Sequence, residues 1–107
     1  MDHPKLPANP SLPMLQRYIA RVLEYRGFAN QTTKDEMLML CEEVGELAKA
    51  IRQHEGRPKA VDSASFAVSE EIADVIWMAI CVANRLDIDV ESAICAKEER
   101  NKKRSWQ

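Results

Sequence analysis

The chain has 107 residues and a formal net charge of −2, so it is expected to form one domain with a modest core and has no basic excess with which to bind a nucleic-acid polymer. Hydrophobic residues make up 46% of the chain and charged residues 30%, which is typical of a globular protein. Because the longest apolar run has nine residues, against roughly 20 for a membrane span, and the N-terminus lacks the basic-then-apolar order of a signal peptide, we expect a cytoplasmic protein without a membrane partner.

The N-terminal segment differs in composition from the rest of the chain. Four of the five prolines fall within residues 1–13, so residues 1–11 are expected to form an extended arm. Downstream, glycine is scarce, alternating strand patterns are absent, and Ala, Leu, Glu, Lys and Met are abundant, which predicts an all-α domain over residues 12–107. Its first helix is predicted over residues 12–26, with Pro13 in the opening turn and a stop at Gly27.

A second helix is predicted over residues 34–53, with Thr33 as a candidate N-cap and a stop near Gly56. Its apolar residues recur at helical spacing, which indicates the face that packs in the core. This predicted stripe consists of Met37, Leu40, Cys41, Val44, Leu47, Ala48 and Ile51.

A third helix is predicted over residues 65–86, after a polar connection at residues 54–64. It contains the apolar run Val75–Ala83, which is apolar on every side, as in a helix that is buried all round. A fourth helix is predicted between a cap at Asp89 and Arg104.

The three cysteines are Cys41, Cys81 and Cys95. They show no CxxC spacing, and each lies within an apolar helical pattern. Reduced, packed thiols are therefore predicted in preference to a metal or redox role.

Two of the predicted helices each carry a pair of acids three residues apart. Glu43 and Glu46 lie on the second helix, and Glu71 and Asp74 lie on the third. Residues at this spacing are neighbours on a helix surface, so antiparallel packing of the two helices would bring all four acids together. At an effective dielectric constant near 20, two like charges about 5 Å apart repel by roughly 3 kcal/mol. A cation is therefore expected among the acids, and Mg²⁺ takes oxygen ligands of this kind.

The competing interpretation is a solvated helix face with ordinary surface acids, which describes most isolated ExxE pairs. Two such pairs beside apolar positions, one of them leading into the run Val75–Ala83, favour the metal site. A di-iron carboxylate bundle would need Glu-x-x-His pairs. Neither His3 nor His54 follows a glutamate at that spacing, so a di-iron site is excluded.

The fourth helix changes from apolar to cationic along one line. Val90 and Ile94 begin this line, and Lys97, Asn101 and Arg104 continue it at helical spacing. One interpretation is a basic, fraying C-terminus that only interacts with the helix dipole. The other is a set of donors for a polyphosphate whose remaining charge is held by a metal at the acids.

These features resemble the all-α nucleoside triphosphate pyrophosphohydrolases of the MazG type, over residues 12–106. The resemblance rests on three stretches, "EEVGEL", "EEIADV" and "KEERNKKR", which are similar to the family's EExxE, ExxD and K-x3-N-x2-R patterns. The first pattern alone is weak, but all three in order on separate helices are specific. The resemblance implies a four-to-five-helix bundle whose core is shared within a homodimer or homotetramer, which agrees with the apolar run on the third helix.

The resemblance also implies an activity, namely Mg²⁺-dependent hydrolysis of an NTP or dNTP between the α and β phosphates, with Mn²⁺ as an alternative ion. It assigns the metal ligands to Glu43, Glu46, Glu71 and Asp74. It assigns the orientation or deprotonation of the attacking water to Glu42. It assigns phosphate contacts to Lys97, Asn101 and Arg104. Cleaning of the nucleotide pool is the expected role, while hydrolysis of phosphoribosyl-ATP and a non-enzymatic oligomeric module that binds nucleotide, metal or a protein partner stay open.

The residues that would bind the base are less defined. Trp77 is a candidate for stacking on the base because it lies three residues after Asp74, although core packing is the commoner role of such a tryptophan. The further candidates, with core packing again favoured, are Tyr18, Tyr25 and Phe28. Many relatives have an aromatic residue where this chain has Met78 and a glycine where it has Asp87, so their base selectivity does not transfer to this chain.

Overall fold

The structure is a computed structural model that describes residues 2–56 and 61–104. It contains four α-helices in the order α1 Leu12–Tyr25, α2 Thr33–Gly56, α3 Val61–Arg85 and α4 Val90–Lys102. No strand occurs among the described residues, so the predicted all-α class is confirmed. Residues 57–60 of the predicted connection and Trp106 lie outside the described part. No helix within that part is both long enough and apolar enough to cross a membrane.

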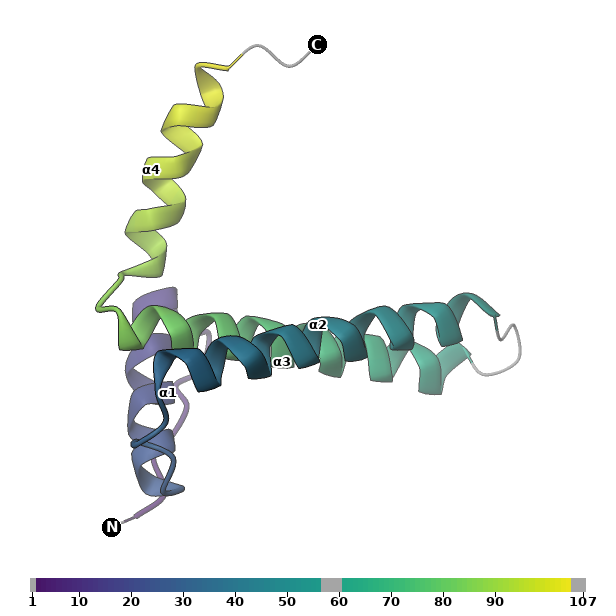
Figure 1. Ribbon diagram of the computed structural model, residues 1–107, viewed down its shortest axis with the longest axis horizontal. Helices are drawn as coiled ribbons and strands as arrows, with labels where there is room; N and C mark the ends of the chain where they lie inside the picture. Colours follow the sequence, from purple (N-terminus) through teal and green to yellow (C-terminus); the bar gives the residue numbers. More distant parts are fainter. Residues whose placement is uncertain (1, 57–60, 105–107) are drawn as a thin grey trace.

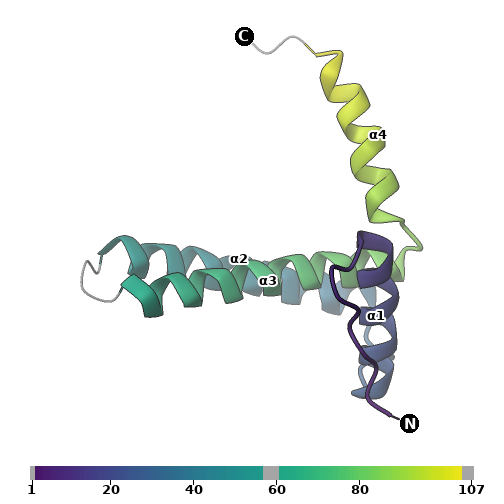
Figure 2. The same cartoon turned by 180° about the vertical axis from the view of Figure 1, so that it is seen from behind.

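The helices are arranged as a long hairpin with two attachments at one end. Helices α2 and α3 lie side by side and antiparallel, and α1 crosses the end of this hairpin where α3 finishes (Figure 1). Seen from behind, the arm that precedes α1 runs along that helix, and α4 points away from the hairpin (Figure 2). The radius of gyration is 16.6 Å, against about 13 Å for a compact domain of this length. A single chain is therefore more open than a closed bundle.

The ends of α1 lie where the sequence predicts them. The Ser11 hydroxyl accepts a hydrogen bond from the Met14 amide, and a proline stands in the first turn. At the other end, Gly27 has a φ of 82° and the Phe28 amide donates to the Leu23 carbonyl at 2.8 Å. This left-handed termination is easiest for glycine, because a Cβ atom would be strained there.

The start of α2 is shifted by one residue from the prediction. The Thr32 hydroxyl accepts a hydrogen bond from the Asp35 amide at 3.1 Å, and the Thr32 amide donates to the Asp35 carboxylate at 3.0 Å. This reciprocal capping box makes Thr32 the N-cap, so the prediction of Thr33 is wrong, since Thr33 is already helical. Both long helices also extend further into their connection than predicted, to Gly56 and from Val61.

The predicted cap of α4 is confirmed. The Asp89 carboxylate accepts a hydrogen bond from the Ser92 amide at 2.8 Å. Just before it, Asp87 has a φ of 54°, and the Ile88 amide donates to the Ala83 carbonyl at 2.9 Å. Helix α3 thus ends in the same left-handed manner as α1, with an aspartate in the position that glycine favours.

A glutamine side chain fixes α1 to the junction between α3 and α4. Gln16 donates to the Asn84 side chain at 2.9 Å and to the Ile88 carbonyl at 2.8 Å. Its own side-chain oxygen accepts from the Val90 amide at 2.9 Å, and its backbone carbonyl accepts from the Asn84 amide group at 3.0 Å. This network sets the direction in which α4 starts.

The packing face of α2 differs from the predicted apolar stripe. The buried and half-buried residues of α2 alternate at spacings of three and four, namely Thr33, Glu36, Leu40, Glu43, Leu47, Ala50 and His54. Only two of the seven predicted positions belong to this face. The other five, all exposed, are Met37, Cys41, Val44, Ala48 and Ile51. The most apolar stripe of the helix therefore lies beside the contact with α3, and the contact itself includes two acids.

The apolar run of α3 is buried on some sides only. Met78, Ile80 and Cys81 are buried and form the core with Ile19 of α1, whereas Ile76 is 50% exposed. The expectation that this run is buried all round is therefore not met within one chain. The three cysteines are free, and Cys81 alone is packed, because the other two lie on exposed faces of α2 and α4.

Candidate metal centre and nucleotide site

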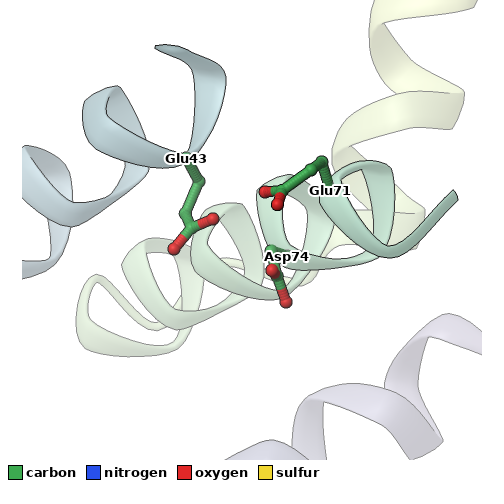
Figure 3. A group of neighbouring side chains, drawn as sticks. All are labelled: Glu43, Glu71 and Asp74. Atoms are coloured by element: carbon green, nitrogen blue, oxygen red, sulfur yellow. The ribbon is translucent and has the colours of Figure 1, made fainter. Parts of the chain in front are cut away.

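Three carboxylates meet between α2 and α3. Glu43 comes from the packing face of α2, and Glu71 and Asp74 come from successive turns of α3. Each offers one oxygen, and these three oxygens all lie within 4.8 Å of one another. Figure 3 shows the side chain of Glu71 directed toward Glu43, with Asp74 beside them. The i,i+3 spacing on α3 and the antiparallel hairpin produce this arrangement together.

The electrostatics of the three acids are unfavourable without a cation. Burial raises the pKa of Glu43, and the negative charges of Asp74 and Glu71, a hydrogen bond with Glu71 and the charge of Glu46 raise it further. One carboxylate oxygen of Glu71, Oε2, is shielded from solvent and has no hydrogen-bond partner. Closely spaced oxygen donors with an orphaned lone pair suit a hard divalent cation such as Mg²⁺.

Two other predicted site residues lie near this group but outside it. Glu46 is exposed one turn further along α2. It is close enough to Glu43 to contribute to the raised pKa of that residue, but it does not belong to the set within 4.8 Å. Glu42 is exposed on α2 beside Glu43.

The predicted phosphate-binding residues lie on α4, away from the acids. Lys97 and Arg104 are exposed and Asn101 is half-buried, and α4 has no fully buried residue. Helix α4 points away from the hairpin (Figure 1), so the helix that carries Lys97 and Asn101 does not pack along the acids of α2 and α3. The Oδ1 atom of Asn101 is nevertheless shielded from solvent without a hydrogen-bond partner.

The candidate base-stacking residue has a mixed environment. Trp77 is half-buried and packs on the core. The ring of Tyr18 meets it edge-on at 6.3 Å between centroids, and the Arg26 guanidinium lies 5.7 Å from its ring centroid. Trp77 and Phe28 also line one cavity, whereas Tyr25 is exposed and contacts the His3 ring. Core packing thus accounts for Tyr18, and Trp77 combines core packing with a cavity wall.

One buried acid was not singled out from the sequence. Glu36 on α2 is fully buried, and its Oε1 accepts a hydrogen bond from Arg85 Nε at 2.7 Å. Its second oxygen, Oε2, has no hydrogen-bond partner. The sequence did contain a hint, because Glu36 stands seven residues before Glu43 and so falls on the same helix face.

Comparison with known proteins places the chain in a family. A family model described as the MazG nucleotide pyrophosphohydrolase domain matches residues 31–106, which include α2, α3 and α4 and therefore all three converging acids. An uncharacterized protein of Bacillus subtilis (strain 168), YpjD, is 41% identical over 58 residues, which are 53% of this chain and 52% of that protein. The chain thus spans about half the length of the curated relative that it matches. On the strength of the domain match, this chain belongs to the MazG nucleotide pyrophosphohydrolase family.

Proposed function

We propose that this protein hydrolyses nucleoside triphosphates, ribo or deoxy, between the α and β phosphates, releasing a nucleoside monophosphate and pyrophosphate, and that it needs Mg²⁺. The observation that carries the proposal is the convergence of Glu43, Glu71 and Asp74 within 4.8 Å in a chain of the MazG family. Cleaning of the nucleotide pool is the proposed role of this reaction.

The three converging acids would hold the metal. Glu46, exposed on the next turn of α2, has the freedom to swing toward them and complete the set. When bound, Mg²⁺ supplies positive charge that neutralises phosphate oxygens and activates water for attack. The orphaned Oε2 of Glu71 and the raised pKa of Glu43 both support a site that is incomplete without a cation.

Glu42 would orient the attacking water or accept its proton. The helical turn of 100° per residue places it on the flank next to Glu43, where it is exposed. From this flank it would act on a water that is held at the acids.

The phosphate contacts would come from α4 of a second copy of the chain. Helix α4, which carries Lys97 and Asn101, points away from the hairpin that carries the acids (Figure 1). In addition, apolar residues lie exposed on both hairpin helices. Among these are Val44, Ile51, Ile72 and Ile76, each between 41% and 50% exposed. Such surface is stabilised by self-association, so the protein is proposed to form a homodimer or homotetramer, which sedimentation can measure. A stable monomer would contradict this.

The direct test is release of pyrophosphate from each NTP and dNTP with Mg²⁺. We expect cleavage by the wild-type protein, loss of at least about a hundredfold in kcat for Asp74→Asn and Glu46→Gln, and normal activity for Glu70→Gln, whose exposed side chain lies outside the group of three. If no nucleotide is cleaved with Mg²⁺ or Mn²⁺, or if both variants remain active, the enzymatic function is wrong. Phosphoribosyl-ATP belongs in the same substrate panel.

A further inference from the structure

A small cavity lies on the hairpin near the converging acids, and two charged side chains, Glu36 and Arg26, are part of its wall. Its volume is about 150 Å³. The side chains that matter for its chemistry are Phe28, Glu36, Met39, Trp77, Met78 and Cys81. The remaining lining residues are Leu23, Gln31 and Arg26, and the Arg26 guanidinium lies 5.7 Å from the Trp77 ring centroid. The cavity thus combines aromatic and thioether walls with one carboxylate, one guanidinium and one amide. Ligand sites for planar organic groups have this composition.

The cavity follows the same seam of the hairpin as the acids. Met39 lies four residues before Glu43 on α2, and Trp77 lies three residues after Asp74 on α3. Each pair spans one helical turn. Glu36 is seven residues before Glu43, which is about 10 Å along the helix axis at 1.5 Å per residue. A nucleotide whose phosphates lie at the acids can therefore extend its base into this cavity.

The carboxylate of Glu36 is held in a fixed position with one oxygen unused. Arg85 donates to Oε1 at 2.7 Å, and the same guanidinium donates to the carbonyls of Ala29 and Phe28 at 2.7 and 3.2 Å. Oε2 is buried and has no hydrogen-bond partner. Leaving a buried acceptor unpaired is destabilising, so its retention points to a donor that is supplied by a ligand.

The neighbouring thiol does not supply that donor well. Burial raises the pKa of Cys81 to about 11, and the negative charge of Glu36 and a hydrogen bond between the thiol and the Glu36 carboxylate add to this shift. The thiol therefore stays protonated at neutral pH, and an S–H group is only a weak hydrogen-bond donor. An N–H group of a ligand would bind the carboxylate more strongly.

We propose that this cavity is the nucleobase subsite, and that Oε2 of Glu36 selects cytosine by accepting a hydrogen bond from its exocyclic amino group. The inference rests on the proposed function. An ionised carboxylate only accepts hydrogen bonds, so the carbonyl oxygen that uracil and thymine present in the same position would be repelled. A cavity of about 150 Å³ holds a single six-membered ring, which favours a pyrimidine over a purine.

The test uses the wild-type protein and a substrate series that changes one atom group at a time. We expect kcat/KM for dCTP to exceed that for dUTP and dTTP by about ten- to a hundredfold. Cytosine donates a hydrogen bond to the charged Glu36 carboxylate, whereas uracil and thymine have no donor in that position. The triphosphate of 2-pyrimidinone deoxyriboside, which has neither the amino group nor the carbonyl at that carbon, should fall between them. Equal cleavage of dCTP and dUTP, or a preference for dATP, would overturn the inference.

A matched pair of variants assigns the selectivity to one side chain. Glu36→Gln keeps the shape but adds an N–H donor, so the ratio of dCTP to dUTP cleavage should fall at least about tenfold. Glu55→Gln, at an exposed position near the end of α2, should leave the ratio unchanged. If Glu36→Gln folds and keeps the wild-type ratio, Glu36 does not read the base. If it does not fold, the substrate series with the wild-type protein still decides.

Calorimetry with dCMP and dUMP in the presence of Mg²⁺ separates this inference from the proposed function. Tighter binding of dCMP without cleavage of any triphosphate would support the subsite and refute the enzyme. Cleavage of all triphosphates with equal binding of the two monophosphates would refute the subsite alone.

Discussion

Arg85 Nε lies 2.7 Å from Oε1 of Glu36, and this pair joins α3 to α2 at the end of the hairpin where α1 crosses. The carboxylate side chain is 1% exposed, whereas the arginine side chain is 26% exposed. The arginine also donates to two backbone carbonyls of the loop between α1 and α2. One cation therefore neutralises a buried charge and holds that loop.

Loss of the Arg85 guanidinium should destabilise the protein strongly. Arg85→Met leaves the buried Glu36 carboxylate without a partner, which typically lowers the free energy of unfolding by about 3 kcal/mol. Urea denaturation measures this loss. Lys102→Met is the matched control, because it removes a pair with Glu99 in which both side chains are more than 60% exposed, and such pairs contribute about 0–1 kcal/mol. Similar losses for the two variants would contradict the prediction.

The metal-free protein should lose stability as pH rises through the pKa of Glu43. Burial and neighbouring acids raise this pKa above its ordinary value of 4.5, so the folded state binds the proton more tightly than the unfolded state. The resulting stabilisation is fully present below pH 4.5 and is lost as pH rises through the raised pKa. We therefore expect the free energy of unfolding to fall gradually as the pH rises above 4.5.

Glu43→Gln should remove this part of the pH dependence. The measurement is the free energy of unfolding with a metal chelator, from pH 4 to pH 8, for the wild-type protein and the variant. Parallel curves for the two proteins would show that Glu43 does not titrate as described. If Glu43→Gln is more stable than the wild-type protein without metal, Glu43 does not serve the stability of the fold. A side chain that destabilises the metal-free fold is retained for its function.

Mg²⁺ should reverse the repulsion among the acids and raise the melting temperature. At a Mg²⁺ concentration of ten times Kd, binding to the folded state alone contributes about 1.4 kcal/mol, which corresponds to several degrees in Tm for a chain of this size. Asp74→Asn should abolish the shift, and Glu70→Gln should retain it because Glu70 is an exposed acid outside the cluster. If NaCl at the same ionic strength raises the melting temperature of the wild-type protein as much as Mg²⁺ does, the effect does not come from a specific site.

The sequence predicts the local features of this chain well, because each rests on a few neighbouring residues. Gly27, the Asp89 cap and the pair of Glu71 and Asp74 lie where the spacing indicates, whereas Glu46 stays outside the group that Glu43 joins. The packing face of α2 was predicted less well. Hydrophobicity favours the stripe with Met37 and Cys41, whereas the contact with α3 uses the adjacent face that contains Glu36.

The position of α4 also depends on information that no single helix carries. Its amphipathic line from Val90 to Arg104 indicates which face packs but not what that face packs against. In the structure, the Gln16 network fixes only the first turn of α4, and its cationic end lies away from the acids (Figure 1). Tertiary contacts and, in our proposal, a second copy of the chain decide where Lys97 and Asn101 act.

The left-handed residue at the end of α3 offers a test of this junction. Asp87 has a φ of 54°, where a Cβ atom is strained and glycine is not. Asp87→Gly should therefore raise the free energy of unfolding by up to about 1 kcal/mol, whereas Gly27→Ala, at a φ of 82°, should lower it by about 1 kcal/mol. Thermal denaturation of both variants checks the two signs. Because Ile88, which follows Asp87, accepts a hydrogen bond from Gln16, a destabilised Asp87→Gly protein would mean that the aspartate side chain itself holds the turn that orients α4.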